Sequence, residues 1–167
     1  MPDCRVFHLR GTEDGKRRNH LLNKISITMP QPFHLAFPVK DLPETRAFYE
    51  DLLGCTIGRT SDRWIDLDFW GNQLTAHLTE GGDSAAPTNH VDGKEVPVKH
   101  FGAILEMEEW EELAEKLRQH GIDFIIEPYI RFKGEPGEQA TMFFLDPSGN
   151  AIEFKAFRDA KQIFATE

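Results

Sequence analysis

The chain lacks an excess of positive charge. Its 167 residues carry 19 Lys and Arg against 28 Asp and Glu, a formal net charge of −9. Nonspecific nucleic-acid binding needs a positive surface, so this balance argues against a nucleic-acid partner. No apolar run approaches the roughly 20 residues that span a bilayer, so we expect no membrane partner. Only Cys4 and Cys55 are present, and a reducing, cytoplasmic location is the simpler interpretation.

Two common catalytic signatures are also missing. No glycine-rich phosphate loop precedes a predicted helix, and no nucleophile elbow is visible. The chain is nevertheless 40% hydrophobic and 11% aromatic, which is typical of a globular protein. Its length suits a single domain with a substantial core, or two half-domains that share one core.

What the sequence does contain is an internal repeat. The first copy opens with Pro32-Phe-His34-Leu-Ala and closes with Asp68-Phe-Trp-Gly71-Asn72-Gln-Leu-Thr75. The second copy opens with Val98-Lys-His100-Phe-Gly and closes with Asp146-Pro-Ser-Gly149-Asn150-Ala-Ile-Glu153. The openings align His34 with His100, and the closings align Thr75 with Glu153. Two related modules that fold face to face can bring equivalent strands to one shared concave site.

Each copy predicts the element order β-α-β-β-β. In the first, Asp41 can cap a helix that Gly54 ends, and alternation predicts strands at 33–39, 57–59, 64–70 and 73–78. In the second, apolar spacing predicts a helix over 108–120, and we expect strands at 99–105, 124–126, 140–145 and 151–157. The segment 127–139 is extra in the second copy, and such a loop is a reasonable place for substrate specificity.

The repeat also divides the chain. Residues 1–31 form an N-terminal extension without a clear period, which we expect to be flexible, and Met29 could serve as an alternative start. One domain covers 32–160, with module 1 at 32–79, a polar linker at 80–97 and module 2 at 98–160. Residues 161–167 form a C-terminal tail.

These motifs resemble the vicinal oxygen chelate superfamily, which includes glyoxalase I, extradiol dioxygenases and fosfomycin- and bleomycin-resistance proteins. The resemblance covers about residues 32–158, and its most specific segment runs from Asp146 to Glu153. The chain looks closest to small proteins described as predicted extradiol-type dioxygenases. The resemblance implies an α+β fold in which two βαβββ modules form a half-open mixed β-barrel around a divalent metal.

The resemblance matches three residues to metal ligands. His34 and His100 match the first-strand ligands of the two modules, and Glu153 matches the last-strand ligand of the second. Two histidines and one carboxylate are favoured by non-haem Fe(II) and are also used by catalytic Zn. We therefore expect Fe(II), with Zn, Mn, Ni or Co as alternatives. A lone strand histidine is more often an ordinary polar or core residue, and the repeat is what favours the metal interpretation here.

Three further residues are candidates for catalysis. Position 75 carries Thr where glyoxalase I typically has a fourth ligand, and His77 lies two residues farther along the same strand face. His77 could be a fourth ligand, an acid or base, or merely a strand histidine. Arg131 could hold a substrate carboxylate or oxyanion and Tyr129 could donate a hydrogen bond, although both could equally be surface loop residues.

The leading functional hypothesis is a metal-dependent extradiol-type dioxygenase acting on a small catechol-like substrate. One alternative is a glyoxalase-type lyase or isomerase, for which His77 would serve as a fourth ligand. Another is a non-catalytic binding or resistance protein that sequesters a small molecule. The resemblance also implies a homodimer. Fold alone cannot decide among these functions.

Overall fold

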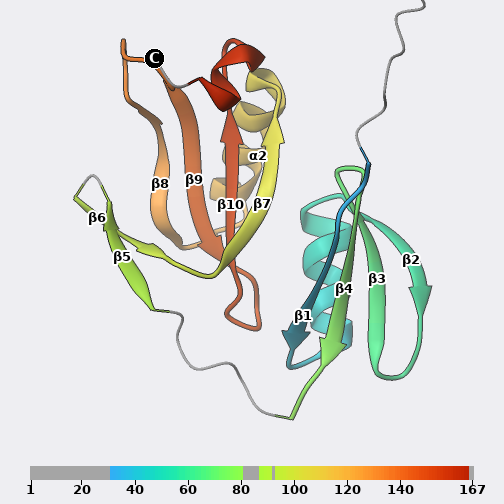
Figure 1. The fold of residues 1–167 in the computed structure, drawn as a ribbon. Helices are drawn as coiled ribbons and strands as arrows, with labels where there is room; N and C mark the ends of the chain where they lie inside the picture. The colour runs from blue at the N-terminus through green and yellow to red at the C-terminus, as the bar shows by residue number, and fades with distance from the viewer. Residues whose placement is uncertain (1–30, 81–86, 92, 166–167) are drawn as a thin grey trace, which may run out of the picture. The chain divides into compact units, whose positions relative to one another are not determined.

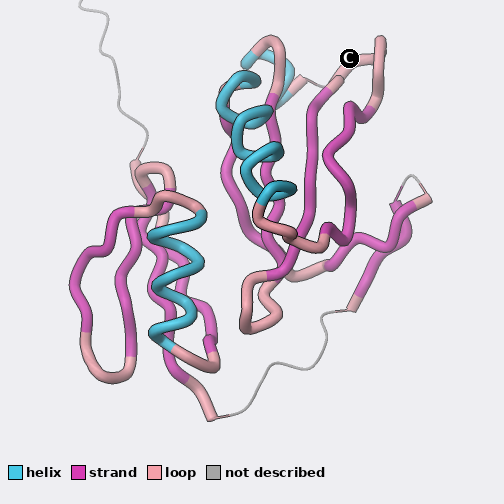
Figure 2. Tube along the Cα trace, turned by 180° about the vertical axis from the view of Figure 1, so that it is seen from behind, coloured by secondary structure: helices cyan, strands magenta, loops and turns pink. Residues whose placement is uncertain are grey.

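The computed structural model describes residues 31–80, 87–91 and 93–165. Each predicted module is present as a four-stranded sheet with helical structure on one face (Figures 1 and 2). The elements of module 1 are β1 (His34–Val39), α1 (Leu42–Arg46), η1 (Ala47–Leu52), β2 (Thr56–Thr60), β3 (Trp64–Phe69) and β4 (Asn72–Leu78). Those of module 2 are β7 (His100–Leu105), α2 (Met107–Gln119), β8 (Phe124–Arg131), β9 (Gln139–Leu145) and β10 (Ala151–Ala156).

The two sheets have the same topology. Their strand orders are β1-β4-β3-β2 and β7-β10-β9-β8. In each sheet the first strand pairs in parallel with the last, and the remaining neighbours are antiparallel. This equivalence confirms the predicted α+β fold of two βαβββ modules.

Local sequence explains how the helix of module 1 begins and which face the helix of module 2 buries. The side chain of Asp41 accepts a 2.7 Å hydrogen bond from the Glu44 amide and so caps α1. The α-helix α1 continues directly into the π-helix η1. In module 2, α2 buries an apolar stripe against its sheet. The stripe consists of Trp110, Leu113, Ala114 and Leu117.

The apolar cores of the two modules form one cluster. Phe37 of β1 contacts Phe101 of β7, with ring centroids 5.1 Å apart, and the Phe69 and Phe154 rings are 5.7 Å apart. The interiors of the two half-domains are therefore continuous, as the length of the chain permits.

The turn between β9 and β10 joins the modules through polar contacts. Asp146 accepts hydrogen bonds from the Ser148 and Asn150 amides, at 2.9 and 2.8 Å. The hydroxyl of Tyr49 on η1 donates to Asp146 at 3.1 Å, and Asn150 Nδ2 donates to the Pro38 carbonyl at 2.9 Å. The most specific motif of the sequence thus has a structural role, because it fixes the start of the strand that carries Glu153.

Two segments hold more strand structure than the sequence predicts. The polar linker 80–97 contains a β-hairpin, β5 (Thr88–Val91) and β6 (Lys94–Pro97), whose strands pair antiparallel. The extra segment 127–139 is not all loop, since β8 continues to Arg131. Pro128 is tolerated there because β8 is the edge strand and its register with β9 shifts between Ile126 and Tyr129.

The predictions for the chain ends are only partly testable. The N-terminal extension lies outside the described residues except for Gln31. The start of the predicted tail, 161–164, belongs to a short 3₁₀ helix, η2 (Ala160–Phe164). No helix of the described segments is long and apolar enough to cross a membrane.

Candidate functional site

The parallel pairing of β7 and β10 brings His100 and Glu153 together. Within this ladder, Gly102 lies opposite Glu153 and His100 lies opposite Ala151. Ile152 and Phe154 are buried in the core together with residues of α2, so alternation turns Glu153 to the opposite face of the sheet, which we call the open face. There His100 Nε2 lies 3.2 Å from Glu153 Oε2.

The other ring nitrogen of His100, Nδ1, already makes a hydrogen bond. Nδ1 lies 2.6 Å from the Pro97 carbonyl oxygen, which can only accept, so Nδ1 carries a proton. In the neutral imidazole, Nε2 then presents a lone pair to a carboxylate oxygen that also holds lone pairs. A proton or a metal ion between the two atoms resolves that conflict, and a backbone carbonyl holding the other ring nitrogen is usual for metal-binding histidines.

Two more side chains hold Glu153. Thr141 Oγ1 donates to Oε1 at 2.8 Å, and Lys155 Nζ lies 3.3 Å from Oε2. Burial alone would raise the pKa of Glu153, but His100, Lys155 and Thr141 together lower it. The hydrogen bond to Glu153 raises the pKa of His100 against the opposing effect of burial. The lowered pKa favours a charged carboxylate, which is held by the Lys155 ammonium and the Thr141 hydroxyl.

His34 does not join this pair. It lies at the exposed start of β1, opposite Gln73 of β4. No three His, Cys, Asp or Glu side chains in the described segments gather closely enough to hold a metal. Within one chain, the structure brings together two of the three predicted metal ligands.

The remaining predicted residues lie on two sheets. His77 is exposed on β4, opposite Pro38 and Trp64. Tyr129 and Arg131 lie on β8, opposite Thr141 and Gln139 of β9. Because Thr141 contacts Glu153, alternation places Tyr129 and Arg131 on the face that carries the His100–Glu153 pair.

A second polar cluster, not predicted from the sequence, lies on the face of the module 1 sheet that carries Thr75 and Gln73. Asp66 of β3 is buried and accepts hydrogen bonds from Thr75 Oγ1 at 2.7 Å and Gln73 Nε2 at 3.2 Å. Arg59 of β2 donates to the same carboxylate through Nε and Nη2, at 3.2 and 3.1 Å. The alternation of 64–69 contained the signal, because it places Asp66 on the polar face, opposite Thr75.

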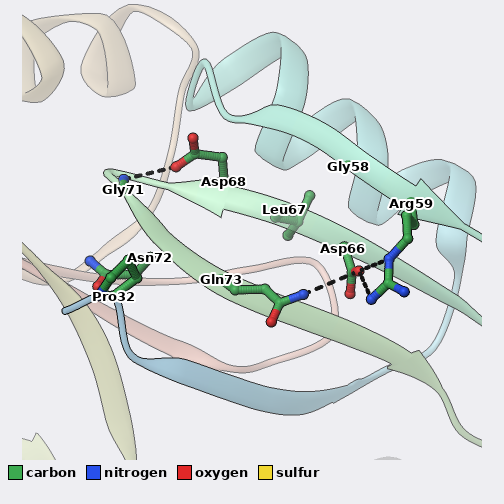
Figure 3. A pocket seen from close by; sticks show the side chains of 9 residues that line it. All are labelled: Pro32, Gly58, Arg59, Asp66, Leu67, Asp68, Gly71, Asn72 and Gln73. Atoms are coloured by element: carbon green, nitrogen blue, oxygen red, sulfur yellow. Dashed lines mark hydrogen bonds and ion pairs between the residues drawn. The ribbon is translucent and has the colours of Figure 1, made fainter. Parts of the chain in front are cut away.

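A cavity of about 390 Å³ opens beside this cluster (Figure 3). Gln73 and Arg59 reach toward Asp66 from neighbouring strands, whereas Asp68 turns to the Gly71 amide. Because Gln73 is also the residue opposite His34, the cavity and His34 share one face of the sheet. The cavity is lined by Pro32, Gly58, Arg59, Asp66, Leu67, Asp68, Gly71, Asn72 and Gln73.

Comparison with known protein families fits this arrangement of two modules. The model of the Glyoxalase/Bleomycin resistance protein/Dioxygenase superfamily matches residues 31–154, which include both modules. The chain belongs to this superfamily. Members of the glyoxalase superfamily typically use divalent metals and bind small-molecule substrates.

Individual relatives within the glyoxalase superfamily differ in their described activities. A glutathione transferase FosA of Serratia marcescens is 28% identical over 127 residues, which are 72% of this chain and 76% of the relative. A glyoxalase/bleomycin resistance protein/dioxygenase from Alicyclobacillus acidocaldarius has 35% identity and a TM-score of 0.65, covering 80% of this chain and 96% of that one. A lactoylglutathione lyase from Agrobacterium tumefaciens, at 16% identity and a TM-score of 0.54 over 78% of this chain and 96% of that one, supports the fold alone.

Proposed function

We propose that this protein is a divalent-metal enzyme whose site is built on His100 and Glu153. The observation that carries the proposal is the 3.2 Å approach of His100 Nε2 to Glu153 Oε2 while Nδ1 is held by the Pro97 carbonyl. This pair presents one nitrogen and one carboxylate oxygen in fixed directions. Such donors suit Fe(II), Zn or Mn and leave coordination positions open for a substrate.

His34 supplies the third ligand in this proposal. Because His34 does not join the pair within one chain, we assign the third ligand to His34 of a second copy. A homodimer would then hold two equivalent sites, each taking His100 and Glu153 from one copy. The exposure of His34 at the start of β1 supports this assignment.

The bound metal would act as a Lewis acid toward two adjacent oxygens of the substrate. Thr141 fixes the direction of Glu153 through its 2.8 Å hydrogen bond. His77 accepts a proton from a substrate hydroxyl as a general base. Tyr129 donates a hydrogen bond to a substrate oxygen, and Arg131 pairs with a substrate oxyanion.

Extradiol cleavage of a catechol-like substrate is the reaction we prefer. The two-histidine, one-carboxylate set is the one that O₂-activating Fe(II) enzymes use. Transfer of a thiol such as glutathione is the second candidate, favoured by the similarity to the glutathione transferase FosA. The two differ in their co-substrate, O₂ or a thiol.

Metal and co-substrate measurements test the proposal. Anaerobically purified protein would be loaded with Fe(II) and tested for O₂ uptake against a catechol panel, then with Mn(II) for glutathione consumption with small electrophiles. His100→Ala should abolish tight metal binding. The control, His120→Ala, removes an exposed ring whose Nδ1 lies 2.7 Å from the Lys116 carbonyl oxygen on α2, away from the His100–Glu153 pair. Unchanged metal stoichiometry in His100→Ala would refute the site.

Mixing two inactive variants tests the shared site. His34→Ala and His100→Ala homodimers should each lack a complete site. After subunit exchange, one site of each mixed dimer has all three ligands, so part of the metal binding should return. If His34 and His100 of the same copy served one site, mixing the two variants would restore no metal binding.

A further inference from the structure

The open face of module 1 carries a guanidinium that the metal site does not use. Arg59 directs Nε and Nη2 at Asp66 Oδ2, although its side chain is 79% exposed. These two nitrogens form one edge of the planar group. The other edge, through Nη1, makes no hydrogen bond within the described residues. A planar fork of this kind matches a carboxylate in a two-point interaction.

Several features of the sheet hold Arg59 in place. The register of β2 against β3 shifts between Ile57 and Thr60, and such bulges redirect side chains. At Gly58, a Cβ would lie only 3.2 Å from Asp66 Cβ, so the absence of a side chain lets the strands approach. The guanidinium carbon lies 5.7 Å from the Trp64 ring centroid, a cation–π distance. An arginine held in this way loses less conformational freedom when it binds a ligand.

The nearby carboxylates do not cancel this role. Asp66 is buried, and both of its carboxylate oxygens already accept hydrogen bonds, from Thr75, Gln73 and Arg59. Asp68 accepts from the Gly71 amide at 2.8 Å and points away along the turn (Figure 3). The exposed edge of Arg59 is the cationic group at the cavity of about 390 Å³.

We propose that Arg59 anchors a carboxylate of the substrate, so that the enzyme selects substrates bearing an acid group away from the two metal-binding oxygens. This inference rests on the proposed metal site. His34 and the cavity share one face of module 1 through Gln73. A substrate bound at the metal through His34 can therefore extend its acid group toward Arg59.

Ligand binding to the Zn(II)-loaded full chain tests this selection. Zinc is redox-inert, so catechol and its acid relatives bind without turnover. Titration calorimetry would compare catechol with 3,4-dihydroxybenzoate and 3,4-dihydroxyphenylacetate. We expect at least one acid to bind about tenfold more tightly than catechol. Equal affinity for catechol and both acids would overturn the inference.

Variants assign the preference to one side chain. Arg59→Met should abolish the preference for the acid, and Arg59→Lys, which keeps a charge beside Asp66, should fold and retain only part of it. Arg46→Met is the matched control, because Arg46 also pairs with a carboxylate, Glu50 at 2.7 Å, but on α1. A full acid preference in Arg59→Lys and Arg59→Met would refute the assignment.

Failure of this inference can be distinguished from failure of the proposed function. If the wild-type chain binds zinc and catechol without preferring the acids, only the role of Arg59 is wrong. If the wild-type chain binds no zinc, the metal site itself is wrong and the role of Arg59 is refuted with it.

Discussion

Thr75 donates a 2.7 Å hydrogen bond to Asp66. Position 75 carries no carboxylate, unlike the equivalent Glu153, but the Asp66 carboxylate lies beside it on the adjacent strand. Module 2 has the reverse arrangement, in which Thr141 of β9 donates to Glu153 of β10 at 2.8 Å. In each module a threonine therefore donates to a buried carboxylate. The partners differ, because Asp66 faces a permanently charged arginine, whereas Glu153 faces Lys155 and also a histidine that can exchange its proton for a metal.

Thr141→Val should weaken metal binding. The substitution keeps the shape of the side chain but removes the donor that orients Glu153 Oε1. Loss of such an outer partner typically costs about 10-fold or more in metal affinity. Competition with a chromophoric zinc chelator would measure the change. Thr75→Val is the matched control and should leave metal affinity unaltered, since Asp66 is not a ligand; equal effects of the two variants would contradict this distinction.

Asp66 should make the fold sensitive to acid. The Thr75 hydrogen bond, aided by Arg59 and opposed by burial, lowers the pKa of Asp66 in the folded chain. A lowered folded pKa gives stability that is present above the unfolded pKa, about 3.9, and is lost as the pH falls through the folded pKa. In Asp66→Asn that part of the acid dependence should disappear.

Urea unfolding at pH 7 and pH 3 would measure this effect. At pH 7, Asp66→Asn should be on the order of 1–3 kcal/mol less stable, because Arg59 and the buried network lose an acceptor. The exposed Asp123→Asn serves as the control. An Asp66→Asn chain whose stability still fell with acid as steeply as that of the wild type would refute the role of Asp66.

The sequence allowed the modules and the His100–Glu153 pair to be predicted, because the repeat aligned equivalent strands. It did not reveal Asp66, since the alignment compares position 75 with Glu153 but does not compare neighbouring strands. The hairpin β5–β6 was hidden by its polar composition, which is typical of exposed strands as well as loops. The separation of His34 from the pair within one chain could not be predicted, because a repeat does not specify which modules share a site.

Gly102→Ala should disrupt the site through the backbone. A Cβ at this position would overlap the Glu153 backbone carbonyl across the β7–β10 ladder. Relief requires the strands to separate, and we expect a loss of about 3 kcal/mol or more in unfolding free energy, together with weaker metal binding. The equivalent position in module 1 is Ala36, opposite Thr75, where a Cβ is accommodated.

Chemical denaturation and zinc titration would test Gly102→Ala together. Ala36→Gly is the matched control, because it removes a Cβ at the equivalent ladder position and should cost only about 1 kcal/mol. If Gly102→Ala retained wild-type stability and zinc affinity, the close approach of β7 to Glu153 would be wrong.

Cys55 should be chemically inert in the folded chain. Its thiol is buried, and burial, followed by the charge of Asp68, raises its pKa to about 12. At pH 8 the thiolate fraction should be on the order of 10³-fold lower than for an ordinary exposed cysteine. Because the thiolate is the nucleophile, a Cys4→Ala chain should react very slowly with a disulfide reagent until urea unfolds it. Fast reaction of the folded chain would show that Cys55 reaches solvent as a thiolate and would contradict its burial.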